Sequence, residues 1–220
     1  MPAFIRAKES GFFDDTMPDA PSARIVISVR PDRLPLCRLL LTYGFRFQAR
    51  AGVSVSEFLV NALPIDPGYL AEQVQTIFKD GNPVDFPDQT EIRQSCTLSL
   101  SAAMPGVFGA AFRKDGHFGP LRRQGMPSCC QAPAGQQQDT LCVTVKCFNA
   151  VAAAIGDHLL HQGVCMGKAD FHRFWRLHGD NLKMETHWMP IDEADLPEEQ
   201  TGNGLTDDSD QIWVTVEAVD

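Results

Sequence analysis

One order of elements is predicted twice along this sequence, and that repetition constrains the fold more than any other feature. Each half contains a strand, a helix ended by glycine, a second strand, a capped helix, a Pro-x-Asp corner and a last strand. The halves align at a nearly constant offset, which pairs Ile25 with Cys142, Gly44 with Gly163, Phe58 with Phe174 and Thr97 with Trp213. Self-similarity of this kind predicts an internal duplication. Two unrelated α+β segments are the alternative.

The first predicted unit covers residues 23–121 and opens with a strand and a helix. Residues 24–29 are rich in β-branched side chains, which favour strands. Apolar residues at helical spacing predict a helix over residues 36–43, and Gly44 stands where a C-terminal cap belongs. Alternation of apolar and polar residues then predicts a half-buried strand over residues 45–50.

A second helix is predicted behind Ser54. Ser54 and Glu57 have the spacing of a capping box, in which the serine hydroxyl accepts from the third helical amide. Apolar residues on one face of this helix predict that it lies across a sheet, and Pro64 ends it. The unit continues with a strand that leads into a turn at Asp80-Gly81, a corner at residues 83–85, a strand over residues 97–100 and a tail of small residues.

The second predicted unit covers residues 140–220. Before it, residues 122–139 have almost no apolar side chains to bury and are predicted to be a linker, and residues 1–22 are predicted to be a flexible leader. The unit's predicted elements are a strand over residues 142–146, a helix over residues 151–161 ended by Gly163, a helix capped by Asp170 with Phe171, Phe174 and Trp175 on its apolar face, a corner at residues 189–192 and a strand over residues 212–216.

Short motifs in both units resemble those of one known group of proteins. Residues 54–59 are similar to its Thr/Ser-Val-x-x-Leu helix start, and residues 80–84 to its Asn-Gly-x-x-Val corner. Residues 145–149 and 210–214 are similar to its first and last strands. The group is that of the small sulfur carriers, the molybdopterin synthase small subunit and the thiamine-biosynthesis sulfur carrier. The resemblance implies an α+β fold of two tandem β-grasp (ubiquitin-like) units, each a mixed sheet with a helix packed across one face.

The sequence departs from the sulfur carriers at the residues that carry their chemistry. The resemblance implies adenylation and thiolation of a terminal glycine carboxylate. The second unit ends in Glu217-Ala218-Val219-Asp220 without a glycine, and the chain continues beyond Gly109 in the first unit. A sulfur-carrier function would therefore require cleavage after Gly106 or Gly109.

The charge balance and the cysteines bound the possible functions. The formal net charge of −9 argues against binding to nucleic acid or to anionic membranes, because both depend on Lys and Arg near phosphate. No apolar run approaches the roughly 20 residues of a spanning helix, and the N-terminus lacks the apolar core of a secretory signal. Seven cysteines without a Cys-x-x-Cys pair favour reduced thiols. These features predict a cytoplasmic protein.

The best candidate site is a stretch of small and apolar residues that follows the last strand of the first unit: Met104, Pro105, Gly106, Val107, Phe108 and Gly109. Glycine permits close approach of the backbone, and exposed Met and Phe side chains are typical anchors for a protein partner. The alternative is a tight crossover in which Val107 and Phe108 pack under residues 110–112.

Histidines and cysteines offer a second candidate, a metal or redox site. His158, His161 and Cys165 have short spacings, with His172, His178 and His187 nearby, but Gly163 separates Cys165 from the helix and incidental histidines are the simpler interpretation. Cys129 and Cys130 in the linker could be redox-active. We predict no metal ligand, cofactor or catalytic residue from these patterns, and no residue nominates a reaction.

The sequence therefore predicts a non-enzymatic, cytoplasmic module that binds a protein partner or acts like a carrier. The alternatives are a sulfur-carrier-related protein and a metal- or redox-binding protein that uses cysteine and histidine of the second unit. Neither nucleic acid nor a membrane is expected as a partner.

Overall fold

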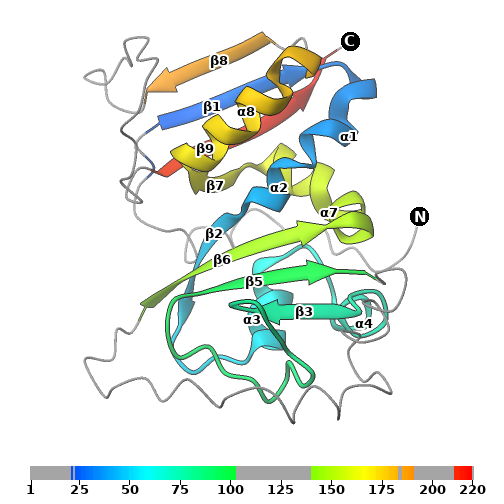
Figure 1. Ribbon diagram of the computed structural model, residues 1–220, viewed down its shortest axis with the longest axis vertical. Coiled ribbons are helices and arrows are strands. Elements are labelled where there is room, and N and C mark those ends of the chain that lie inside the picture. The colour runs from blue at the N-terminus through cyan, green and yellow to red at the C-terminus, as the bar shows by residue number, and fades with distance from the viewer. Residues whose placement is uncertain (1–20, 22, 103–139, 183–184, 191–210, 220) are drawn as a thin grey trace.

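The computed structural model describes residues 21, 23–102, 140–182, 185–190 and 211–219, with the backbone alone for residues 185–190. The fold is α+β, as the sequence predicts, with two mixed sheets (Figure 1). Residues 104–109, 122–139 and 191–210, and the leader apart from residue 21, lie outside the described residues. The predicted leader and linker boundaries therefore stay predictions.

Sheet A has the strand order β7-β9-β1-β8. Its two inner strands, β9 (Gln211–Ala218) and β1 (Ala23–Val29), are parallel, and the outer strands β7 (Val164–Gly167) and β8 (Glu185–Pro190) are antiparallel to their neighbours. The inner pair thus joins the first described strand of the chain to the last one.

Sheet B has the strand order β2-β6-β5-β3-β4. Its strands are β2 (Phe45–Arg50), β6 (Thr140–Phe148), β5 (Cys96–Ser101), β3 (Thr76–Lys79) and β4 (Asn82–Pro83). The β5–β6 pair is parallel and the other pairs are antiparallel. Both sheets therefore have an inner parallel pair with antiparallel strands beside it.

The two sheets exchange strands between the predicted halves of the chain. β1 belongs to the first half but pairs with β8 and β9, and β6 belongs to the second half but pairs with β2 and β5. We expected each half to supply its own sheet, and the pairing differs from that expectation. A local strand pattern specifies the buried face of a strand but not the sheet it joins, so the sequence could not predict this pairing.

The helices are short in the first half and longer in the second. They are the 3₁₀ turn η1 (Pro31–Arg33), α1 (Leu34–Cys37), α2 (Leu40–Tyr43), α3 (Val55–Ala62), α4 (Pro67–Glu72), α7 (Asn149–Gln162) and α8 (Lys168–Leu182). Figure 1 shows α8 in front of sheet A and α3 behind sheet B.

The two glycines predicted to end helices and the predicted N-cap at Ser54 are confirmed. Gly44 and Gly163 have φ angles of 114° and 97°, and each stands between a helix and the strand that follows it. The Ser54 hydroxyl accepts from the Glu57 amide at 3.2 Å, as the capping-box spacing predicts. These φ values suit glycine because a Cβ crowds the neighbouring backbone there.

The turn at Asp80-Gly81 is also confirmed. Both residues have positive φ, 50° and 78°, which is the geometry of a tight hairpin between β3 and β4. The Asp80 carboxylate accepts from the Thr97 amide at 2.8 Å and so ties the turn to β5.

Other local predictions are wrong. The helix over residues 36–43 is broken between α1 and α2, where Leu41 donates to the carbonyl of Arg38 three residues earlier. Asp170 is not a cap, because α8 begins at Lys168 directly after β7. Met189 and Pro190 lie in β8 and not in a corner. β7 and α4 were not predicted, although Asp66 caps α4 and Pro67 opens it.

The alignment of Ile25 with Cys142 is off by one residue. Ile25 is fully buried, whereas Cys142 is half-buried and its neighbours Leu141 and Val143 point into the core. A slip of one position moves a side chain to the opposite face of a strand. The structural equivalent of Ile25 is therefore a neighbour of Cys142.

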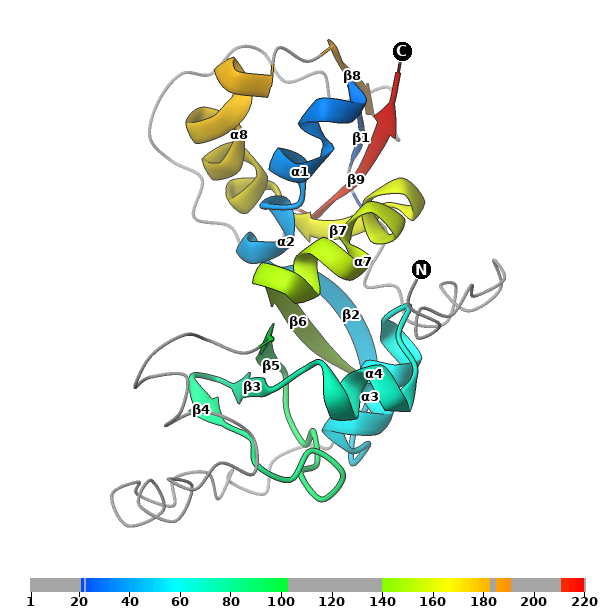
Figure 2. The ribbon, with the colours of Figure 1, turned by 90° about the vertical axis from the view of Figure 1, so that its right-hand side faces the viewer.

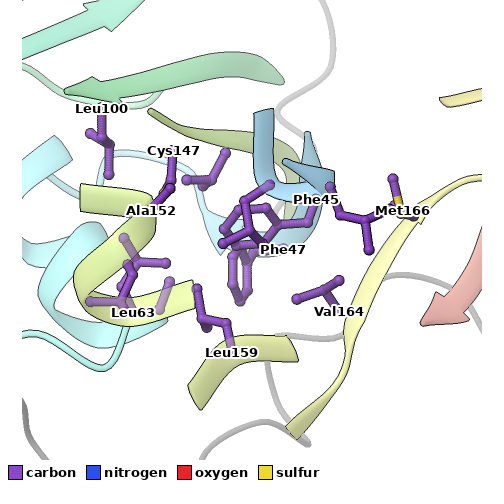
Figure 3. Packing of buried hydrophobic residues seen from close by; sticks show 14 of the residues in the cluster. Phe45, Phe47, Leu63, Leu100, Cys147, Ala152, Leu159, Val164 and Met166 are labelled. Carbon is purple, nitrogen blue, oxygen red and sulfur yellow. The ribbon is translucent and has the colours of Figure 1, made fainter. Parts of the chain in front are cut away.

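One hydrophobic core runs through both sheets. Figure 3 shows Phe45 and Phe47 of β2 beside Leu159 of α7, with Val164 and Met166 of β7 on the other side. The Phe47 ring meets that of Phe58 edge-on, with ring centroids 6.2 Å apart, and this contact holds α3 against sheet B. β2 and β7 therefore form the centre of the molecule, where the two sheets meet.

Candidate functional site

The segment predicted to bind a partner, Met104 to Gly109, lies outside the described residues, but the strand that leads to it is described. β5 lies between β3 and β6 and ends at Ser101. Ser101 is buried, and its carbonyl accepts from the Gln75 amide at 3.1 Å. Its hydroxyl accepts from the Asn149 side-chain amide at 3.4 Å. The chain is thus held on two sides at the point where it leaves sheet B.

Asn149 itself has an unusual conformation. Its φ of 50° lies in the left-handed region, where asparagine is among the residues that tolerate it best. This conformation turns β6 directly into α7. Because β5 and β6 are parallel, their C-terminal ends lie at the same edge of sheet B, and Asn149 can reach across to Ser101.

A buried polar group lies beside this end of β5. Thr76 pairs with Ser101 across the sheet and is 1% exposed. The neighbouring Gln75 side chain has a buried oxygen, Oε1, without a hydrogen-bond partner in the described part of the chain. Residues Ser101, Thr76, Gln75 and Asn149 come from three separate stretches of sequence, and no motif connects them, so sequence reasoning did not find them.

Four of the five described cysteines are buried thiols that are poorly suited to redox chemistry. Burial raises the pKa of the Cys147 thiol to about 12, and it does the same for Cys37 and Cys165. The pKa of Cys96 rises to about 11, chiefly because it is buried. These thiols stay protonated near neutral pH, where a thiol is a poor nucleophile and metal ligand. Cys129 and Cys130 lie outside the described residues.

The structure separates His158 and His161 from Cys165. The two histidines lie on α7, whereas Cys165 is buried in β7 and its Sγ donates to Gln211 Oε1 at 3.0 Å. No three His, Cys, Asp or Glu side chains come together as a possible metal site within the described ranges.

The other histidines considered above, His172, His178 and His187, lie further along the second half. His178 packs on the Phe174 ring, with ring centroids 5.2 Å apart. Burial, and to a lesser degree the nearby Lys168 charge, lowers the pKa of His172. His187 lies in β8, where only the backbone is described. Of the helices that the structure describes, none has the length and apolar character needed to cross a membrane.

Comparison with known proteins adds no relative. No family model matches the chain, and neither the curated proteins nor the solved structures include a match to it. The resemblance to sulfur carriers therefore stays a prediction from short motifs.

Proposed function

We propose that this chain is a non-enzymatic protein-interaction module, with Met104 to Gly109 as its contact with a protein partner. The observation that supports this proposal is the anchored end of β5. The Ser101 carbonyl and hydroxyl are both hydrogen-bonded, to Gln75 and Asn149, only three residues before Met104. A contact segment that leaves from a rigid inner strand loses less conformational freedom on binding than one that leaves from a mobile loop.

The residue types of the segment fit the same proposal. Met and aromatic side chains are enriched in the fully buried centres of protein interfaces, and Met adapts its shape to different partners. The proposed compartment is the cytoplasm, and the free thiols among the described cysteines support it, since disulfides are rare there.

A finer proposal concerns the fold. We propose that sheet A and sheet B, each with its covering helix, are two β-grasp units that have exchanged strands β1 and β6. The inner parallel pair and the outer antiparallel strands found in both sheets support this proposal. The order of the inner pair differs between the sheets, since β6 lies beside β2 whereas β9 lies between β1 and β7.

The interaction proposal is tested by affinity capture from the native host with the full chain as bait. We expect a partner in about equal amount to the bait, lost with the double variant Met104→Ala/Phe108→Ala. The matched control is Leu177→Ala on α8, which shortens a side chain that is 57% exposed and far along the chain from the segment.

Thermal unfolding of each variant separates binding from folding. The proposal requires that the double variant melts at the temperature of the unaltered protein while it loses the partner. A large drop in melting temperature would show instead that Phe108 packs in the core. Equal capture by the double variant would refute the assigned contact.

A further inference from the structure

α1, α2 and α7 connect the two sheets and pack against each other where they cross. The chain runs from β1 in sheet A through α1 and α2 to β2 in sheet B, and from β6 in sheet B through α7 to β7 in sheet A. Figure 2 shows α2 and α7 side by side between the sheets. We name this contact between residues 34–43 and α7 the crossing seam.

The crossing seam brings equivalent positions of the two halves together. Arg38 and Asp157 are 119 residues apart, the same separation as Gly44 and Gly163. The Arg38 Nε donates to Asp157 Oδ1 and its Nη2 donates to Oδ2, both at 2.7 Å. Arg38 and Asp157 therefore occupy matching positions in the alignment that pairs Gly44 with Gly163.

The backbone of α7 also lies close to side chains of residues 34–43 at the seam. A Cβ placed on Gly156, which lies in α7 beside Asp157, would stand 3.1 Å from Arg38 Cγ and 3.2 Å from Leu41 Cδ1. Leu41 is fully buried, so the apolar part of the seam excludes water. The ion pair lies at the rim, where the side chains of Arg38 and Asp157 are 26% and 47% exposed.

Opposite charges at equivalent positions distinguish the correct pairing from its alternatives. Two first halves that met along the same surface would place Arg38 against a second Arg38, and two second halves would place Asp157 against a second Asp157. Like charges in contact disfavour such pairings, and the bidentate Arg–Asp geometry favours the mixed one. A choice of pairing partner arises because each half needs a strand from another half to complete its sheet.

We propose that the crossing seam is the surface by which the two halves of the chain select each other, and that Arg38 and Asp157 determine this selection. The fitting partner of a first half is a second half, from the same chain or from another copy, and not another first half. This inference is independent of the proposed function, because it concerns neither Met104 to Gly109 nor an outside partner.

A competition experiment tests the selection with the full chain. A protease recognition sequence is inserted between Gln136 and Gln137, in the predicted linker, and the folded protein is cut there. The same is done with the double reversal Arg38→Asp/Asp157→Arg. The two cut proteins are mixed in equal amounts, unfolded in urea, refolded and weighed by native mass spectrometry. Matched pairs contain one Arg and one Asp at positions 38 and 157, so both have the same mass. A mismatched pair contains either two Arg or two Asp at these positions, so its mass is higher or lower by the difference between Arg and Asp.

We expect 1:1 complexes of one first half and one second half, with matched pairs in about two- to fivefold excess over mismatched pairs, since the ion pair is partly exposed. Equal amounts of matched and mismatched pairs would overturn the role of the ion pair. Complexes of two first halves, or halves that do not recombine, would overturn the selection itself.

A second measurement needs no cut. Urea unfolding of the full chain compares Arg38→Asp, Asp157→Arg and the double reversal, and the double should recover most of the midpoint lost in each single variant. A double reversal no more stable than the singles would also overturn the role of the ion pair. Reversal of the exposed Glu91–Arg93 pair, which lies within one half, is the matched control and should leave the midpoint nearly unchanged.

Discussion

Gly163 offers the sharpest test of the fold, because a single methyl group there would overlap the indole ring of Trp213. Gly163 ends α7 with a φ of 97°, and a Cβ at this position would lie 2.5 Å from Trp213 Cε2 and 2.7 Å from Trp213 Cζ2. Trp213 lies in β9, which is bonded to β7 on one side and β1 on the other. The Trp213 side chain is half-buried, and its ring must turn or shift from this position to make room for a methyl group.

The loss of stability expected for Gly163→Ala has two parts. An L-residue in the left-handed region costs about 1–2 kcal/mol relative to glycine. Forcing extra volume into a packed site costs about 1–3 kcal/mol more. We therefore expect Gly163→Ala to lower the free energy of unfolding by about 2–5 kcal/mol in a urea titration followed by circular dichroism.

Gly52→Ala is the matched control. Gly52 has a similar φ of 87°, but nothing lies within 4 Å of its Cβ position. This variant should carry only the backbone cost of about 1–2 kcal/mol. If Gly163→Ala is no more destabilising than Gly52→Ala, then the indole is not where the structure places it and the reasoning fails.

Two further predictions concern the thiols and the α3 cap. Folded-state pKa values of about 12 for Cys37, Cys147 and Cys165 lie above the ordinary value of 9.0. The stability that these thiols contribute is therefore fully present below pH 9 and falls as the pH rises from 9 toward 12. We expect the urea midpoint to decrease between pH 8 and pH 10.5. A midpoint that does not change over this range would contradict the burial of these thiols. Ser54→Ala should lower the free energy of unfolding by about 1 kcal/mol in a urea titration, because the Glu57 amide loses its acceptor. Ser54→Asp should keep most of this stability, because its carboxylate can accept from the same amide. Equal stability of all three proteins would exclude the cap.

Local features of this fold were predictable where a position requires one residue type for a single physical reason. Gly44 and Gly163 mark the ends of helices because positive φ suits glycine, and Ser54 marks a start because its hydroxyl replaces a missing acceptor. β1 was recognisable as a strand because it is rich in β-branched residues, and β6 was predicted from residues 142–146. In each of these cases the determining contact lies within a few residues.

Features that depend on distant contacts were not predictable. The patterns of β1 and β6 identify each as a strand but not the sheet that it joins, so the exchange of these strands had no local signal. The break between α1 and α2 lies at the crossing seam, where the Leu41 amide donates to the Arg38 carbonyl. For the candidate site, the sequence pointed to Met104 through Gly109, which the structure does not describe, and it missed Ser101, Gln75 and Asn149 at the base of that segment.

The pairing of β1 with β9 has a consequence for how the protein is made. Ala23 pairs with Ile212, about 190 residues later in the chain. At about 5–20 residues per second, the ribosome needs roughly 10–40 s to synthesise the stretch between them. During that time β1 leaves the exit tunnel without its parallel neighbour, and sheet A can close only after β9 has been synthesised. A chaperone that shields the nascent N-terminal strand would therefore raise the yield of native protein more than one that acts on the finished chain.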